Sequence, residues 1–128
     1  MLDHVSIPVS DLGRSGAFYD AVLEPLGARR RIERPGAVGY GTGQVPGFWL
    51  LEREREGATP GPGLHVCFHA ASAEQVHAFH EAGLARGAKD AGAPGLRPEY
   101  TAGFYGAFLI DPDGYKVEAT WRSALAQS

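Results

Sequence analysis

Two short stretches decide the fold of this chain: Leu2-Asp3-His4-Val5 near its start and Gly63-Leu64-His65-Val66 in its middle. When His4 is placed on His65, a shift of 61 residues, the agreement continues from Ala17-Phe18 to Ala78-Phe79. Each half then contains a strand, a helix, a glycine stop and further strands, which indicates a duplicated βαβββ unit. We expect an α+β protein with one domain over residues 1–128, built from a first module (1–58) and a second module (63–128).

The boundary between the modules is predicted in Gly57–Gly63, where three glycines and two prolines in seven residues disfavour both helix and strand. Asp11 is the expected N-cap of a helix from about residue 12, which Pro25 should end near Leu23. In the second half, Ser72-Ala73-Glu74-Gln75 matches a capping box, and Gly87 should close the helix that follows.

The composition of the chain already excludes some classes of partner. The chain has 128 residues, 44% hydrophobic and 21% charged, which is near the globular average and sufficient for one core. Its formal net charge of −3 offers no basic field for nucleic acid or for an anionic membrane surface. A small molecule is therefore the expected partner.

The single cysteine, Cys67, excludes an internal disulfide. The first residues do not have the pattern of a secretory signal, and the longest apolar runs, such as 107–110, are far shorter than the roughly 20 residues that a membrane helix needs. We expect a cytoplasmic protein without a membrane span.

Strand alternation places three ligand-type side chains on polar strand faces. His4 shares a face with Leu2 and Ser6, whereas His65 shares one with Cys67 and His69. The turn 111–114 should fold residues 107–110 back against 115–121, where Glu118 lies on the face opposite Val117. The apolar faces should pack on the helices, so the polar faces should line a concave cavity.

Two imidazoles and one carboxylate suit a divalent metal such as Zn, Ni, Fe, Mn or Co, and they leave positions open for a substrate. A lone strand histidine is more often a hydrogen-bonded structural residue. Here His4 and His65 fall in register in the repeat, and that favours a metal site formed by His4, His65 and Glu118. We predict that the three side chains converge on one ion.

The chain resembles the vicinal oxygen chelate superfamily, which contains glyoxalase I, extradiol dioxygenases and fosfomycin and bleomycin resistance proteins. The resemblance rests on residues 2–12, Ala17-Phe18-Tyr19, 63–66 and 111–118. It is greatest to a glyoxalase-like bacterial branch that has sequence motifs like those at residues 94–98 and 104–108 here. It implies two βαβββ modules whose eight strands form an open, barrel-like sheet around a metal-containing cavity, with the helices outside. It also implies the ligands His4, His65 and Glu118, and a homodimer, which open sheet edges favour as well.

Glyoxalase I has a fourth protein ligand, and the nearest candidate here is Glu52, which would also be a candidate base. Glu52 follows His4 by 48 residues (52 minus 4), whereas Glu118 follows His65 by 53 (118 minus 65). It also belongs to the alternating charges of 52–56, which are typical of a solvated strand end. A site with three protein ligands is therefore preferred.

The long connection 89–106 is expected to border the substrate pocket with Arg97, Tyr100, Phe104 and Tyr105, which would suit a planar or anionic molecule. The alternative is that these aromatic residues pack between the modules. Thr101 stands where the bacterial branch often has a histidine; if that histidine is an acid or base there, we expect the reaction to be lost or altered in this chain.

Three functions stay open. The first is a metal-dependent lyase or isomerase acting on a small oxygen-chelating molecule. The second is a metal-independent drug- or metabolite-binding protein of the bleomycin-resistance kind, and the third is an Fe(II) extradiol-type dioxygenase, because two histidines and a carboxylate also suit that chemistry. His77, His80 and Glu81 are expected on a solvated helix face, His69 at a pocket rim, and Cys67 as an inert thiol.

Overall fold

A computed structural model describes residues 1–54, 60–61 and 63–123. Of the predicted boundary between the modules, residues 57–59 and 62 lie outside the described part. The ends proposed for the two modules, 58 and 128, also lie outside it.

The two halves have the same order of elements. The first contains β1 (Val5–Val9), α1 (Leu12–Leu23), a 3₁₀ turn (Glu24–Leu26), β2 (Arg29–Arg34), β3 (Ala37–Gly41) and β4 (Phe48–Glu52). The second contains β5 (His65–His69), α2 (Ala73–Ala85), β6 (Lys89–Leu96), β7 (Phe104–Ile110) and β8 (Lys116–Arg122).

The helices begin and end where their sequences predict. Asp11 accepts a hydrogen bond from the backbone N–H of Arg14, and α1 ends at Leu23, two residues before Pro25. The Ser72 hydroxyl accepts from the backbone N–H of Gln75, while the Gln75 side chain accepts from the backbone N–H of Ala71. Neither described helix is both long and apolar enough to cross a membrane.

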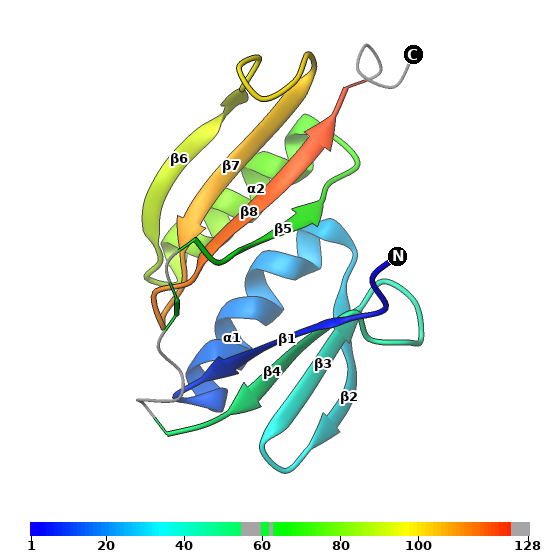
Figure 1. Cartoon of the computed structure of the whole chain (residues 1–128), viewed down its shortest axis with the longest axis vertical. Helices are drawn as coiled ribbons and strands as arrows, with labels where there is room; N and C mark the ends of the chain where they lie inside the picture. The colour runs from blue at the N-terminus through cyan, green and yellow to red at the C-terminus, as the bar shows by residue number, and fades with distance from the viewer. Residues whose placement is uncertain (55–59, 62, 124–128) are drawn as a thin grey trace.

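The strands form two four-stranded sheets with the same topology, which confirms the βαβββ repeat (Figure 1). Their orders are β1-β4-β3-β2 and β5-β8-β7-β6. In each sheet the first strand runs parallel to the fourth, and the other pairs are antiparallel. Within the described residues the two sheets are separate in their hydrogen bonding, so they form an open arrangement and not a closed barrel.

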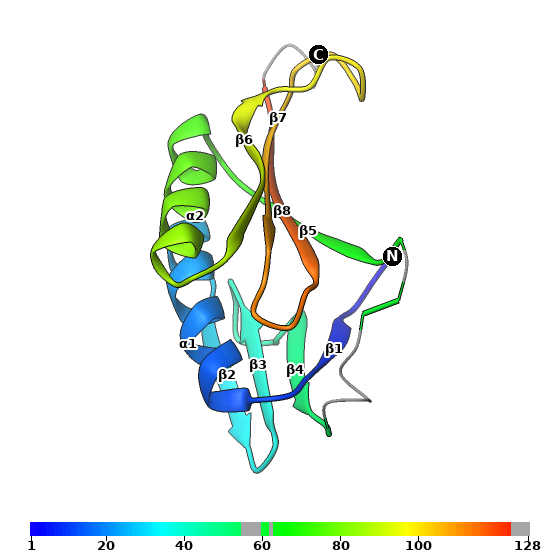
Figure 2. The same cartoon turned by 90° about the vertical axis from the view of Figure 1, so that its left-hand side faces the viewer.

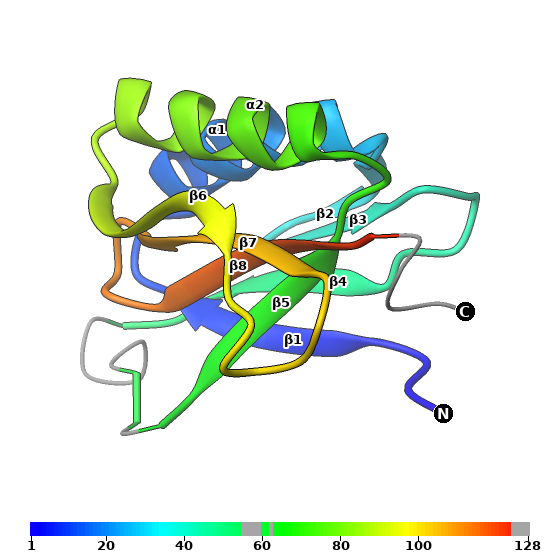
Figure 3. The ribbon, with the colours of Figure 1, turned by 90° about the horizontal axis from the view of Figure 1, so that it is seen from above.

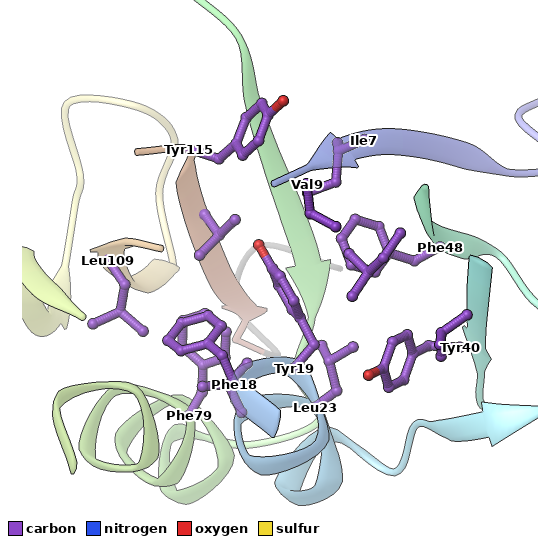
Figure 4. Close-up of a cluster of buried hydrophobic side chains, with 14 of the residues drawn as sticks. Ile7, Val9, Phe18, Tyr19, Leu23, Tyr40, Phe48, Phe79, Leu109 and Tyr115 are labelled. Atoms are coloured by element: carbon purple, nitrogen blue, oxygen red, sulfur yellow. The ribbon is translucent and has the colours of Figure 1, made fainter. Parts of the chain in front are cut away.

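Both helices lie on the same side of the two sheets and pack side by side (Figures 2 and 3). The main core fills the space between helices and sheets, where Phe18 of α1 and Phe79 of α2 face one another among apolar strand residues (Figure 4). Gly83 lets α2 approach β7 closely, because a β-carbon there would collide with the Leu109 side chain. Within the described residues, the opposite faces of the sheets have no helix over them (Figure 3).

A turn of the second half binds the first half at the far end of β1. The Tyr19 hydroxyl donates to the Asp111 carboxylate at 2.5 Å, and the Tyr115 hydroxyl donates to the Pro8 carbonyl at 2.8 Å. Asp113 accepts hydrogen bonds from the hydroxyls of Ser10 and Ser15. Since these bonds join β1 and α1 to the β7–β8 turn, they fix the two modules relative to each other.

Candidate metal and ligand site

The parallel pairing of β5 with β8 brings two of the predicted ligands together. Cys67 is the register partner of Glu118, so His65, two residues earlier, shares its strand face. The His65 Nε2 atom lies 3.6 Å from Glu118 Oε1. Two donors on one ion are about 3 to 3.5 Å apart when each metal bond is near 2.1 Å. This pair is therefore close to the spacing that a shared ion requires.

Burial and a hydrogen bond from Thr120 hold the Glu118 carboxylate in place. Only 5% of its side chain is exposed, against 50% for His65, and its second oxygen accepts a hydrogen bond from the Thr120 hydroxyl at 2.8 Å. The Thr120 oxygen lies 3.3 Å from Cys67 Sγ. This leaves Oε1 directed toward His65, while Oε2 is fixed by the hydroxyl.

The Cys67 side chain next to this pair is a protonated thiol. Partial burial between the strands raises its pKa to about 11, and the nearby negative charge of Glu118 raises it too. At neutral pH the thiol keeps its proton, and it donates that proton toward Thr120. Cys67 is therefore a weak nucleophile in the metal-free protein at neutral pH.

His4 lies in the first half of the chain, just before its sheet begins. It precedes β1, its side chain is 52% exposed, and its Nδ1 atom lies 2.7 Å from the Asp3 carboxylate. Within the described residues, no group of three or more His, Cys, Asp or Glu side chains is placed to hold one ion. A single chain thus brings together His65 and Glu118 without a third such side chain among the described residues, and the convergence of His4 on the same ion stays a prediction. His4 precedes β1 and His65 begins β5, so each histidine is at the start of its own half.

Glu52 does not join the pair either. Its carboxylate accepts a hydrogen bond from the backbone N–H of Leu12 at 2.9 Å, on the side of β4 that faces α1. A negative charge at a helix N-terminus is stabilised by the helix dipole. The expectation of a fourth ligand or base is corrected accordingly: Glu52 is bound to the start of α1.

The position that mirrors Glu118 in the first half is Trp49. Ser6 pairs with Trp49 in the β1–β4 ladder, as Cys67 pairs with Glu118 in the β5–β8 ladder. A shallow hollow of about 290 Å³ lies there, lined by His4, Ser6, Arg34, Ala37, Trp49 and Leu51. The Arg34 guanidinium lies 5.5 Å from the centre of the Trp49 ring. The first half therefore presents a histidine and an indole where the second presents a histidine and a carboxylate.

The pair His65 and Glu118 opens into a concavity of about 450 Å³ on the second sheet. Besides these two it is lined by Cys67, Tyr100, Phe104, Phe108, Lys116 and Arg122. Tyr100 stands edge-on to Phe104, with ring centres 5.2 Å apart. The expected pocket residues Tyr100 and Phe104 are thus beside the ligand pair, and Arg97 reaches the same group through Phe108, at 5.7 Å from that ring's centre.

Tyr105 does not line this concavity. Adjacent strand residues point to opposite faces, so Tyr105 lies on the helix side when Phe104 lies on the pocket side. Its hydroxyl is 2.7 Å from His77 Nε2, and its ring stands edge-on to Trp121. The expectation for Tyr105 is corrected, and the same contact gives His77 a partner on the surface of α2.

The predicted pocket did not include Phe108, Lys116, Arg122 or Trp49. Counting in twos from Glu118 along β8 reaches Lys116 in one direction and Arg122 in the other, so alternation alone was sufficient to find them. Phe108 and Trp49 need the strand register, because each is identified by the residue across from it. Thr101 also has a role, since its hydroxyl accepts a hydrogen bond from Arg122 at 3.1 Å.

The remaining histidines are placed outside the pair. His80 is buried, and its Nε2 atom lies 3.0 Å from the Asp90 carboxylate, which also accepts from the Gly92 N–H. These bonds lower the pKa of Asp90. His69 borders a separate small hollow together with Thr120 and Arg122.

Comparison with known proteins assigns the class of the protein. The family model of the Glyoxalase/Bleomycin resistance protein/Dioxygenase superfamily matches residues 1–119. The chain belongs to this superfamily, which confirms the resemblance read from its sequence. No curated protein matches the chain in a sequence comparison.

Solved structures agree with this membership. A glyoxalase/bleomycin resistance protein from Albidiferax ferrireducens T118 is 36% identical, with a TM-score of 0.86, over 95% of this chain and 99% of that one. A superfamily enzyme from Burkholderia phytofirmans PsJN is 21% identical, with a TM-score of 0.73, over 94% and 98% of the two chains. A fosfomycin resistance protein from Mesorhizobium loti is 16% identical, with a TM-score of 0.71, over 99% and 96%. The last two show the shared fold.

Proposed function

We propose that this protein is a divalent-metal-dependent enzyme of the glyoxalase kind, which carries out a lyase or isomerase reaction on a small molecule with two neighbouring oxygens. The observation that carries the proposal is the approach of His65 Nε2 to Glu118 Oε1, 3.6 Å apart, at the edge of a concavity. A buried carboxylate beside an exposed imidazole is a donor set suited to Zn, Ni, Fe, Mn or Co.

Two protein donors are fewer than the three that catalytic metal sites usually have. We propose that the third is His4 of a second copy of the chain in a homodimer. Three observations support this: His4 is half exposed, it stands at the repeat position of His65, and it borders a hollow of the first half together with Ser6 and Trp49. Since Trp49 mirrors Glu118, the joined halves would supply two histidines and one carboxylate.

A bound divalent ion would polarise the two substrate oxygens and stabilise the negative charge that develops on them. The chain's own residues prepare this site. Thr120 orients the Glu118 carboxylate, and Tyr100, Phe104 and Phe108 give the pocket an apolar wall that excludes water. Glu52 is engaged with α1, so the proton transfer of such a reaction has to be carried by another group.

The proposal is tested by metal titration of the purified, untagged protein after treatment with a chelator. An ion that binds only the folded state raises the melting temperature as its concentration rises. We expect Zn²⁺, Ni²⁺ or Mn²⁺ to do so at one ion per chain. Glu118→Gln should abolish this shift, and the matched control Glu52→Gln should keep it. A wild-type protein that no divalent ion stabilises would refute the proposal.

One observation favours a second candidate, a metal-independent binding protein. The described residues of one chain contain no three-donor group, whereas Tyr100, Phe104 and Phe108 already form an aromatic wall. In that case Glu118→Gln would leave ligand binding intact, and Tyr100→Ala would weaken it through lost ring contacts. The two substitutions therefore give opposite patterns for the enzyme and for the binding protein.

A further inference from the structure

Cationic side chains surround the pocket that holds His65 and Glu118. Lys116 and Arg122 are part of its lining, and Glu118 is the only carboxylate among the described residues that line it. Arg97 adds a third cation behind Phe108. The whole chain has a net charge of −3, so this excess of positive charge is local to the pocket.

Each cation lies against a phenylalanine ring. Lys116 Nζ is 4.7 Å from the centre of the Phe108 ring, and Arg122 Cζ is 5.1 Å from that of Phe104. A ring attracts a cation through its quadrupole but carries no net charge, so it holds the cation in place and does not neutralise it. Within the described part of the chain, no carboxylate pairs with Lys116 or Arg97.

The position of Arg97 depends on space that two glycines leave on β6. A β-carbon at Gly92 would lie 3.2 Å from one terminal nitrogen of Arg97 and 2.9 Å from the Phe108 ring. One at Gly95 would lie 3.1 Å from the other terminal nitrogen. The guanidinium is also anchored by a 2.7 Å hydrogen bond to the Ala93 carbonyl. Arg97 is thus fixed against Phe108 by the local chain.

Lys116 reaches Phe108 from β8, and Arg97 reaches it from the position that follows β6. Phe108 pairs with Glu118 on one side and with Gly92 on the other. Lys116 is two residues from Glu118 and is the register partner of His65, so its ammonium belongs to the same end of the pocket as the donor pair. Tyr100, which is 55% exposed, extends the wall toward the other end.

We propose that the pocket selects a molecule with an anionic group such as a carboxylate, which lies beside Lys116 at Phe108, while Arg97 adds positive charge from behind the ring. The flat apolar body of this molecule then rests against Tyr100 and Phe104. This inference deepens the proposed function by naming its substrate class, and it rests on that function for the reaction but not for the binding.

The test compares benzoate with benzamide, two flat aromatic probes of the same shape that differ in charge. Binding is measured by titration calorimetry or ligand-observed NMR on the full chain with chelator present, so that no ion contributes. We expect benzoate to bind roughly tenfold more tightly than benzamide, and the difference should shrink as salt is added.

Lys116→Met keeps the aliphatic stem on Phe108 but removes the charge, so it should bring the two probes within about threefold of each other. The matched control Lys89→Met removes an exposed lysine at the start of β6, away from the pocket lining, and should leave the preference unchanged. Melting curves of both variants report whether the fold is intact, and Arg97→Gln provides a second reduction of the preference.

Equal binding of benzoate and benzamide, binding of neither probe, or a preference that survives both Lys116→Met and Arg97→Gln would overturn the proposal. A failed metal titration would refute the proposed enzyme but would leave the anion preference in place. The two failures are therefore distinguishable.

Discussion

The two halves of the molecule have the same strands in the same order, but they carry different chemistry. His4 and His65 occupy matching positions, yet the partner of Ser6 in the first half is Trp49, whereas the partner of Cys67 in the second is Glu118. Arg34 lies against the Trp49 ring, and Thr120 donates a hydrogen bond to Glu118. The connection after β6 belongs to the second half, and it brings Arg97 and Tyr100 next to the pocket of that half. Duplication has preserved the framework, while the donor pair and its pocket belong to one copy of the repeat.

The largest expected effect comes from removing either histidine. If the proposed site joins the halves of two copies, His4→Ala and His65→Ala should each weaken metal binding by about a hundredfold or more, because a three-donor site loses one donor. The measurement is a metal titration followed by melting temperature, with His69→Ala as the control. A loss with His65→Ala alone would show that the first half contributes no ligand.

The next effect concerns Cys67, whose counterpart in the first half is Ser6. With a pKa of about 11, the thiol should react with iodoacetamide at pH 8 roughly a hundredfold more slowly than free cysteine. Glu118→Gln removes a negative charge that raises this pKa, so it should accelerate the alkylation. Mass spectrometry over a pH series measures the rate, and alkylation of the native protein at the rate of free cysteine would contradict the described environment.

A smaller effect is expected where the halves are joined. Tyr19→Phe removes a buried hydrogen bond to Asp111 and should lower the free energy of unfolding by about 2 kcal/mol. Tyr105→Phe, whose hydroxyl meets His77 at the surface, is the control and should change it by less than about 0.5 kcal/mol. Urea unfolding of both variants measures these free energies. An equal loss in the two variants would mean that the Tyr19 bond to Asp111 stabilises the fold no more than a surface contact does.

The same junction sets a pH dependence. Burial raises the pKa of Asp111 above its ordinary value of 3.8, so the folded state binds this proton more tightly than the unfolded chain does. The contribution of Asp111 to stability is then fully present below pH 3.8 and is lost as the pH rises through the folded pKa. Because the Tyr19 bond lowers this pKa, Tyr19→Phe should extend the loss to higher pH, which urea unfolding between pH 3 and 8 would show.

The smallest effect tests the asymmetry itself. Trp49→Glu places a carboxylate at the position that mirrors Glu118, and in a site shared by two copies it should tighten metal binding by about tenfold. Trp49→Gln is the matched control without the charge. Unchanged or weaker binding in Trp49→Glu would mean that the first half does not face the ion.

Much of this comparison was predictable from the sequence, because it depends on local patterns. The repeat of His4 on His65, Asp11 and Pro25 at the ends of α1, and the place of Glu118 on the pocket face all follow from capping and alternation. Tyr105 was assigned to the wrong face, although the same alternation separates it from Phe104. Glu52 was suggested by the resemblance, although its spacing from His4 did not match, and the ladder shows Trp49 at the position that mirrors Glu118.

What the sequence could not supply is the placement of one sheet relative to the other. Strand patterns state which face a side chain is on, but the distance from His4 to Glu118 depends on how the modules pack. That packing is set by contacts such as Tyr19 with Asp111, which join residues 92 positions apart. That His65 and Glu118 meet without a third such side chain among the described residues therefore became visible only in three dimensions.

The central claim is that the metal site joins the first half of one copy to the second half of another. Mixing the His4→Ala and Glu118→Gln proteins, after unfolding and joint refolding, tests it most directly. Each mixed dimer would regain one intact site, so metal binding should return to about a quarter of the wild-type capacity, although neither variant binds alone. A mixture that binds no more metal than its separate components would contradict the claim.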